Sequence, residues 1–283
     1  MVKINKLFIP YVIILIFAGF GYSFLVAFFW IVLHETAHII VARYLGIDNI
    51  KMHFIPMGTY IESKMFDETK PKEDIIISLA GPLTNIIMAA FLYNVYKYFP
   101  SNIIKVSFDT NLVFGIFNLM PAFPLDGARI LRAVLSRKIM YKRANKITVK
   151  CSLITGFLLL GYFIFLLILG KVNLSIGLIA FLIIAISYKE RERIMYIIMG
   201  DIIRKKRRFL KDSYIENKTI SVYYKKDLIT VLGLVDKNKY NLFTLLDEEM
   251  KVVDILTEYD VLEGLKLYGN ITIEEFLKIR DEK

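Results

Sequence analysis

The sequence has one cysteine among its 283 residues, Cys151. The chain therefore cannot form an internal disulfide, and it lacks the clustered cysteines of a thiolate metal site. Because Cys151 borders an apolar segment, we expect it to act as a small packing residue. Any metal site in this chain must be built from other side chains.

Charged stretches are scarce over much of the chain. Apolar residues make up 56% of the sequence, above the usual range of roughly 45–50%, and the mean hydropathy is +0.51. Long uncharged runs predict a polytopic membrane protein instead of a large soluble core. The net charge of +10 is then typical of cytoplasmic loops that face anionic lipid, so we expect no nucleic-acid partner.

The chain also lacks a small-x-small cleavage site after its first apolar run, so we expect an uncleaved first span instead of a signal peptide. The apolar runs predict about six spans. One of them, at 111–123, is broken, because it is too short for a regular crossing and prolines interrupt it. The spans are expected at about 7–19, 22–45, 75–96, 111–123, 152–169 and 172–187.

Basic residues gather on one side of this predicted membrane. With the N-terminus in the cytoplasm, residues 46–73, 125–150 and those after 188 lie inside, and the external loops carry only three lysines. Because Lys and Arg favour the cytoplasmic side, we expect an integral membrane protein with both termini in the cytoplasm.

Three ionisable residues interrupt the second predicted span: His34, Glu35 and His38. Residues four apart in a helix share a face, so His34 and His38 can hold one zinc ion. Glu35 lies about 100° around the helix from His34, where it can take a proton from a metal-bound water. Ionisable groups in hydrocarbon are costly, which favours a functional role. The competing interpretation is chance, since this motif alone occurs in many unrelated soluble chains.

A third metal ligand is available where the fourth span breaks. Asp126 follows two prolines there and precedes Gly127. Broken backbone at membrane depth is tolerated where it is buried in protein or lines a cavity, so Asp126 could offer its carboxylate to the metal. The alternative is an ordinary N-cap for a helix that begins at Ala128.

Two features near the motif are left open by spacing alone. Gly81-Pro82 kinks the third span and either frees backbone groups or serves simple packing. Asn85 either joins helices or supports the site.

Residues 52–62 predict a hairpin, and His53 within it has no spaced partner, so we expect it to be structural or solvated.

The composition changes after the last predicted span. Residues 191–212 indicate a basic linker helix at the membrane surface. Residues 213–283 have no run long enough to cross a membrane. Strands at 242–246 and 251–256, followed by a helix with Thr257 as its cap, predict a small α+β cytoplasmic module.

Three motifs together resemble the site-2 protease family of intramembrane zinc metalloproteases, peptidase family M50. They are His34-Glu35-x-x-His38, Ala80-Gly81-Pro82-Leu83-x-Asn85 and Asn118-x-x-Pro121-x-x-Pro124-Leu125-Asp126-Gly127, in the family's order. The resemblance covers roughly residues 1–190. The predicted fold class is an all-α polytopic membrane protein, with about six transmembrane segments of which one is broken, followed by the α+β module.

The resemblance implies roles for single residues. The ligands of one Zn²⁺ per chain would be His34, His38 and Asp126. Glu35 would be the catalytic residue of a zinc metalloendopeptidase, and Asn118 would lie near the substrate or polarise its carbonyl. Further residues at the substrate or around the ligands would be Asn85, Pro121 and Pro124. The 52–62 hairpin would hold the substrate extended at its edge.

The resemblance extends to the tail and to biological context. The stretch 251–262 is similar to the end of a CBS (cystathionine-β-synthase-type) motif, which implies ATP binding with Thr257 and Asp260 as contacts. The chain also resembles bacterial family members that cleave the pro-sequence of a sporulation sigma factor. This implies a pro-sigma factor as membrane-associated substrate, membrane inhibitor proteins and a homo-oligomer as further partners, and the mother-cell membrane around the forespore as location.

Two other functions are compatible with part of the sequence. A membrane zinc transporter or sensor without proteolytic activity would explain His34, His38 and Asp126 but would leave Glu35 without a role. A non-catalytic relative that only binds membrane substrates is disfavoured by the complete ligand set.

Overall fold

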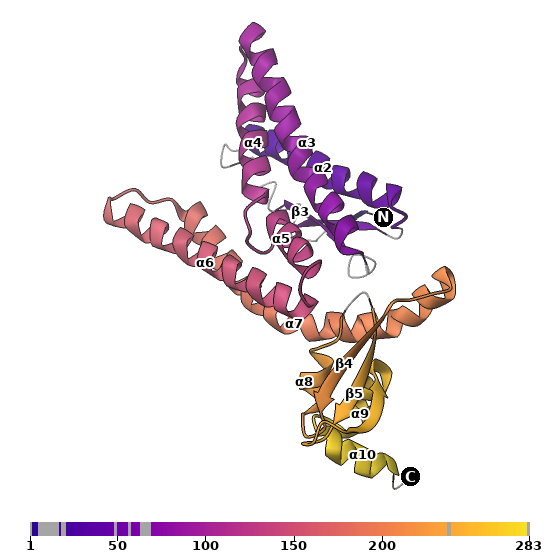
Figure 1. Cartoon of the computed structure of the whole chain (residues 1–283). Coiled ribbons are helices and arrows are strands. Elements are labelled where there is room, and N and C mark those ends of the chain that lie inside the picture. Colours follow the sequence, from indigo (N-terminus) through magenta and orange to yellow (C-terminus); the bar gives the residue numbers. More distant parts are fainter. Residues whose placement is uncertain are drawn as a thin grey trace. The chain divides into compact units, whose positions relative to one another are not determined.

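The computed structural model describes residues 2–4, 17, 21–47, 50–55, 58–62, 69–236 and 239–281. The chain divides into two compact units. Unit 1 comprises Met1–Val134 and Thr148–Tyr188, and unit 2 comprises Leu135–Ile147 and Lys189–Lys283. Figure 1 shows the elements of both units along the chain.

The helices of unit 1 form a packed bundle. The first three are α2 (Gly21–Tyr44), α3 (Pro71–Tyr98) and α4 (Asn102–Asn118). α3 lies against both α2 and α4, and α2 also contacts α4 (Figure 1). In the described part of the chain, three helices are long and apolar enough to cross a membrane: α2, α3 and α6 (Tyr141–Ile168). They contain or closely match the spans expected at 22–45, 75–96 and 152–169.

The other expected spans have different outcomes. The span at 7–19 lies almost entirely outside the described residues. The bounds at 111–123 are wrong, because α4 already begins at Asn102, where the Ser101 hydroxyl accepts a hydrogen bond from the Ile104 N–H at 3.4 Å. Hydropathy misplaces this helix because its buried face is built from small and polar residues: Ser107, Asn111 and Gly115.

The last expected span and the basic linker form one continuous helix, α7 (Leu174–Asp212). The apolar stretch at 172–187 is therefore only the first part of a 39-residue helix. Among the described residues, three helices and not six have the length and composition of a membrane span. The short helix α5 (Asp126–Ser136) follows α4 and precedes α6 along the chain.

A small sheet belongs to unit 1. Its strands β1 (Val2–Ile4), β2 (Lys51–Ile55) and β3 (Gly58–Glu62) lie in the order β1-β2-β3. β2 and β3 pair antiparallel, with His53 opposite Tyr60, so the predicted hairpin at 52–62 is confirmed. Among the described strands β3 pairs only with β2, and it packs against α2. Among the described strands, β3 therefore has one unpaired edge, and the strand itself lies beside α2.

Unit 2 contains a second three-stranded sheet, in the order β4-β5-β6. β4 (Asn217–Tyr223) pairs parallel with β5 (Tyr240–Leu246), which pairs antiparallel with β6 (Val252–Thr257). The accompanying helices are α8 (Leu228–Leu232), α9 (Glu258–Tyr268) and α10 (Ile273–Asp281). Alternate residues of β5 are buried, so one face of the sheet forms the core of the unit. The predicted α+β module is confirmed, although only two of its strands and one helix were expected.

The basic segment of α7 contributes a buried cation to this core. Lys205 is only 3% exposed, although it belongs to a run of five basic residues at 204–208. Its ammonium donates to the Glu258 carboxylate at 2.8 Å and to the Asp236 carbonyl at 2.9 Å. Asn241 also donates to Glu258, at 2.7 Å. The linker is thus more than a charged membrane-facing surface, since its Lys205 is part of the module's interior.

Candidate metal centre

Two buried histidines lie one turn apart on α2. His34 is 5% exposed and His38 is 3% exposed. Gly81 of α3 faces both rings: a Cβ atom at this position would lie 2.6 Å from His34 Nε2 and closer still to His38 Nε2. The absence of a side chain at Gly81 therefore makes room for the two imidazoles. The sequence indicated only a kink or packing role here, because a contact with another helix leaves no local signal.

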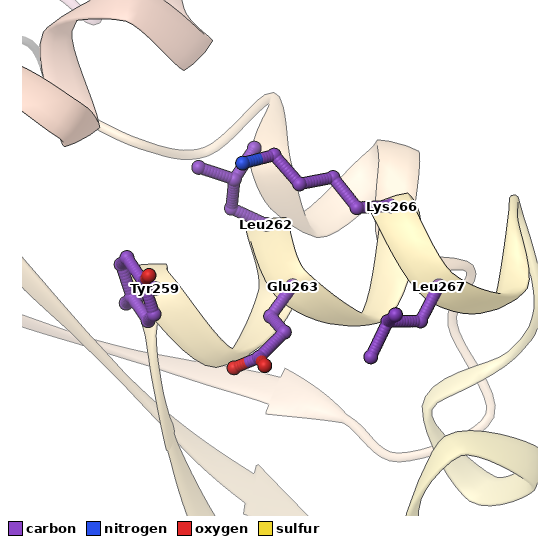
Figure 2. A pocket seen from close by; sticks show the side chains of 5 residues that line it. All are labelled: Tyr259, Leu262, Glu263, Lys266 and Leu267. Atoms are coloured by element: carbon purple, nitrogen blue, oxygen red, sulfur yellow. The ribbon is translucent and has the colours of Figure 1, made fainter.

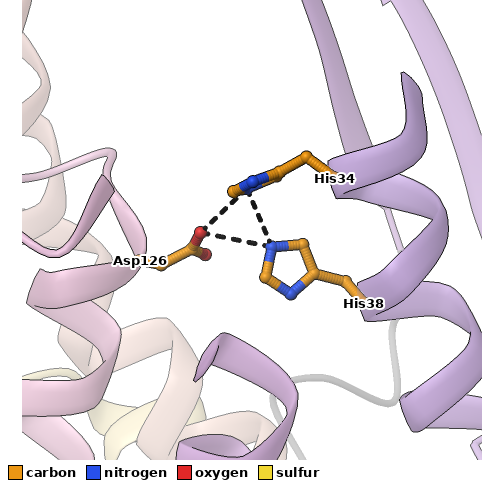
Figure 3. A group of neighbouring side chains, drawn as sticks. All are labelled: His34, His38 and Asp126. Carbon is orange, nitrogen blue, oxygen red and sulfur yellow. Dashed lines mark hydrogen bonds and ion pairs between the residues drawn. The ribbon is translucent and has the colours of Figure 1, made fainter. Parts of the chain in front are cut away.

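The structure brings the third expected ligand to the same point (Figure 3). Asp126 lies at the start of α5, and its Oδ2 atom is 3.2 Å from the Nε2 atoms of both His34 and His38. The two Nε2 atoms are 3.1 Å apart. Among the described residues these three side chains form the one group of its kind that could hold a metal ion.

The opposite ring nitrogens of the histidines are tied to α3. His38 Nδ1 lies 2.6 Å from the Ile77 carbonyl, which can only accept, so Nδ1 carries the proton. His34 Nδ1 lies 3.3 Å from the Asn85 side-chain oxygen and donates to it. These bonds fix the ring orientation, as the second partners of metal-binding histidines commonly do. Asn85 therefore supports the site and does not merely join helices.

The donor set fits a cation. In the neutral tautomers set by these bonds, both Nε2 atoms present lone pairs, and they converge with a carboxylate oxygen. Three acceptors at 3.1–3.2 Å repel one another unless a positive charge lies between them. A tetrahedral zinc ion with bonds of roughly 2.0–2.1 Å separates its ligands by about 3.3–3.4 Å, close to the observed distances.

Arg129 supplies positive charge beside the site. Its guanidinium donates to Asp74 at 2.8 Å and also interacts electrostatically with Asp126. Burial opposes ionisation of Asp126, whereas the positive charge of Arg129 favours it. Arg129 thus supports the charged, metal-binding form of this carboxylate. Arg129 and Asp74 were missed by the sequence analysis, although both are charges next to apolar runs.

The Glu35 side chain lies near the candidate ligands. It follows His34 on α2 and lies close enough to interact electrostatically with His34, Asp126 and Arg129. Among the described residues, no side chain forms a hydrogen bond or an ion pair with the Glu35 carboxylate. It is thus placed near the centre without being one of the three converging ligands.

The remaining candidates of the broken segment lie around the ligand loop. Asn118 ends α4, and its amide donates to the Phe114 carbonyl of the same helix at 3.0 Å. Pro121 and Pro124 are exposed residues of the loop that leads to Asp126. Among the described residues, neither histidine forms a hydrogen bond with any of these three side chains. The side chain of His53 lies outside the described part of the chain.

Thr257 and Asp260, the residues expected to contact ATP, stabilise the start of a helix in unit 2. The Thr257 hydroxyl accepts from the Asp260 N–H at 3.2 Å, and Asp260 Oδ2 accepts from the Thr257 N–H at 2.7 Å. Together they form the capping box of α9. A pocket of about 170 Å³ lies beside this helix (Figure 2), lined by Tyr259, Leu262, Glu263, Lys266 and Leu267. Neither expected contact lines it, so it gives no support for ATP binding.

Fold and centre together define a class, namely membrane proteins whose helices hold a three-ligand metal centre of the two-histidine, one-carboxylate type. The chain belongs to peptidase family M50, the site-2 protease family. The model of this family matches residues 22–109 and 100–159, which include all three ligands and Glu35.

Individual relatives agree with this assignment. A zinc metalloprotease of Methanocaldococcus jannaschii is 38% identical over 129 residues, which are 44% of this chain and 37% of that protein. Stage IV sporulation protein FB of Bacillus subtilis is 25% identical over 165 residues, 58% of this chain and 57% of that protein. The chain therefore spans between 37% and 57% of the length of these two relatives.

A solved structure shows the same fold. The site-2 protease from Methanocaldococcus jannaschii superposes with a TM-score of 0.53 at 28% sequence identity. The alignment covers 67% of this chain and 90% of that one. The likeness therefore extends over nearly the whole of the solved chain.

Proposed function

We propose that this protein is an intramembrane zinc metalloprotease that hydrolyses a peptide bond of a membrane-associated protein. The observation that carries the proposal is the convergence of His34 Nε2, His38 Nε2 and Asp126 Oδ2 within 3.1–3.2 Å. Three protein ligands leave a fourth tetrahedral position for water or substrate, the arrangement of a catalytic and not of a closed structural zinc site. Bound zinc would supply an acidified water, with a pKa of about 7, and would polarise the scissile carbonyl.

Glu35 has the proton-transfer role in this mechanism. Its carboxylate takes the proton of the attacking water as the new C–O bond forms at the scissile carbonyl carbon. It then passes that proton to the leaving amide nitrogen as the C–N bond breaks. Water is consumed, and the two products are a carboxyl and an amine terminus. The transporter alternative assigns no such step to Glu35.

The edge of β3 supports a way to present the substrate. A peptide bond inside a helix is shielded by its neighbours, so a membrane segment must be unwound before hydrolysis. β3 has one unpaired edge among the described strands and packs against α2, the helix that carries both histidines. A substrate that adds to this edge as an extended strand would therefore run beside the ligand helix.

The biological setting belongs to the same proposal. The basic loops favour cytoplasmic termini and a cleavage site near the cytoplasmic face. The likeness to stage IV sporulation protein FB supports a sporulation setting. Within that setting, we propose a pro-sigma factor as substrate and the mother-cell membrane around the forespore as location. Other relatives are named only as zinc metalloproteases, so this setting rests on one relative and is the finer part of the proposal.

The test uses the full chain in liposomes with a candidate membrane-tethered pro-protein. Glu35→Gln should abolish cleavage and leave zinc content unchanged, whereas Asp126→Asn should lower both. N-terminal sequencing of the product would locate the cleaved bond. Full cleavage by the Glu35→Gln variant would refute the mechanism, and zinc flux into sealed vesicles without any proteolysis would favour the transporter.

A further inference from the structure

The loop between α4 and α5 carries the third ligand of the candidate metal centre. Within it, the Ala122 N–H donates to the Met120 carbonyl at 2.8 Å, and the Leu125 N–H donates to the Ala122 carbonyl at 2.8 Å. The loop folds closely over Gly127, where any Cβ would collide with the Leu119 carbonyl. These contacts make the loop compact, but all of them are internal to it. They do not explain what holds the loop, and Asp126 with it, in place within the bundle.

One hydrogen bond joins this loop to a different helix. The Phe123 N–H donates to the Ser152 hydroxyl of α6 at 2.8 Å. Phe123 is 4% exposed and Ser152 is fully buried. Ser152 also lies 2.5 Å from the hydroxyl of Ser187 in α7, which is likewise fully buried. Three segments far apart in the sequence thus meet at two hydroxyl groups.

The direction of these bonds follows from the proton count. The Ser187 hydroxyl donates its proton to the Ile183 carbonyl at 2.6 Å. Because each hydroxyl has a single proton, Ser152 must donate to Ser187. The chain therefore runs from the Phe123 N–H through Ser152 and Ser187 to the Ile183 carbonyl, and every group in it is satisfied. Chains of this kind are cooperative in a low-dielectric interior.

We propose that Ser152 and Ser187 are positioning residues of the metal centre, which hold the ligand-bearing loop on α6 and α7 and thereby fix Asp126. Phe123 lies three residues before Asp126, and its ring packs in the same small cluster as Ala128 and Val149. The hydrogen-bond chain and the apolar cluster thus attach the loop at one place. The inference rests on the proposed zinc site and adds to it two residues from helices that supply no ligand.

Ser152 is expected to matter for the metal centre because the buried Phe123 N–H would otherwise lack a hydrogen-bond acceptor. Water is scarce within a membrane-embedded bundle, and a buried N–H without a partner is strongly unfavourable there. Without the Ser152 hydroxyl, the loop must move to satisfy the Phe123 N–H, and a small displacement of Asp126 weakens zinc binding. Simple helix packing by small serines is the competing explanation, and it predicts no effect on zinc.

The experiment measures zinc affinity of the full chain in detergent by competition with a chromogenic chelator. Ser152→Ala should weaken zinc binding about tenfold, the scale expected when a partner of a metal-ligand element is lost. Ser187→Ala should have a smaller effect, because Ser152 can still accept from Phe123. Ser152→Thr keeps the hydroxyl and should retain most of the affinity. The control is Thr155→Val, since the Thr155 hydroxyl donates only to the Cys151 carbonyl of its own helix, at 3.0 Å.

A second measurement keeps the test informative if one of the variants folds poorly. Hydrogen exchange of peptides over residues 119–125, in the presence of chelator, should be faster in Ser187→Ala and Ser152→Ala than in Thr155→Val. Tight zinc binding by the wild type together with equal affinity and equal exchange in all variants would overturn this inference alone. A wild type that binds no zinc would overturn the proposed function and this inference with it.

Discussion

The Arg129 guanidinium of α5 donates a hydrogen bond to the Asp74 carboxylate of α3 at 2.8 Å. Arg129 lies three residues after the ligand Asp126, and Asp74 lies three residues before Ile77, whose carbonyl holds His38. The ion pair therefore joins the helix of one ligand to the helix that orients another. α3 supplies no ligand, yet it forms hydrogen bonds to both histidines and to the helix that begins with Asp126.

Breaking this pair should weaken the metal centre. The Arg129 and Asp74 side chains are 25% and 13% exposed, so removal of one partner should cost about 2 kcal/mol, less than the roughly 3–5 kcal/mol of a fully buried pair. We expect Arg129→Ala and Asp74→Ala to lower both thermal stability and zinc affinity. The control is Lys278→Ala in the exposed pair with Glu274, which should leave the midpoint of thermal unfolding unchanged within error. Unchanged zinc affinity in both test variants would show that the pair does not position Asp126.

A methyl group at position 81 should disrupt the centre. Gly81→Ala places a Cβ at 2.6 Å from His34 Nε2 and still nearer His38 Nε2, so the rings must rotate away from Asp126. We expect loss of most bound zinc, measured by metal analysis after gel filtration. Gly161→Ala is the matched control, because no atom lies within 4 Å of a Cβ at that helical position. Equal zinc content in both variants would show that Gly81 is only a packing residue.

The three side chains that converge in the structure are those that the sequence offered as candidate ligands. His34 and His38 have the spacing of one helical face, so local chemistry marks them. At the proline-broken segment, local chemistry left Asp126 open between a metal ligand and a helix cap, and the family resemblance favoured the ligand. The residues that surround and hold these side chains could not be predicted from local sequence. Gly81 faces the histidines of another helix, and Ser152 bonds to the loop before α5, so only tertiary packing brings these atoms near.

The fold was predictable to a similar degree. The spans that became α2, α3 and α6 are apolar over most of their length, whereas α4 buries Ser107 and Asn111 and so resembles a loop in hydropathy. In unit 2, the burial of β5 alternates from residue to residue, but β4 begins with the polar residues Asn-Lys-Thr and owes its place to its partner strand. Tertiary contacts decide such segments, and they are not visible in a local window.

Loss of the buried cation of α7 should destabilise unit 2. Lys205→Ala leaves the Glu258 carboxylate, which is 1% exposed, with its charge unpaired, so we expect a loss of about 3 kcal/mol and a clearly lower midpoint of thermal unfolding. Lys206→Ala removes an exposed neighbour of the same basic run and should leave the midpoint unchanged within error. Comparable shifts in the two variants would mean that the basic run acts through its overall charge and not through the Lys205 contacts.

The bond between Asn85 and His34 should set zinc affinity without taking part in hydrolysis. Asn85→Ala removes the acceptor of the His34 Nδ1 proton, which frees the ring to turn, so zinc should bind about 10–100-fold more weakly. Asn85→Asp keeps an acceptor and should retain most of the affinity, because carboxylates orient metal-binding histidines in the same way. Asn94→Ala is the control, since its amide donates only to the Ala90 carbonyl of its own helix, at 2.8 Å. At saturating zinc, the cleavage rate of Asn85→Ala should recover toward that of the wild type, because Glu35 remains in place. A rate that stays low when the site is full would instead give Asn85 a direct part at the substrate.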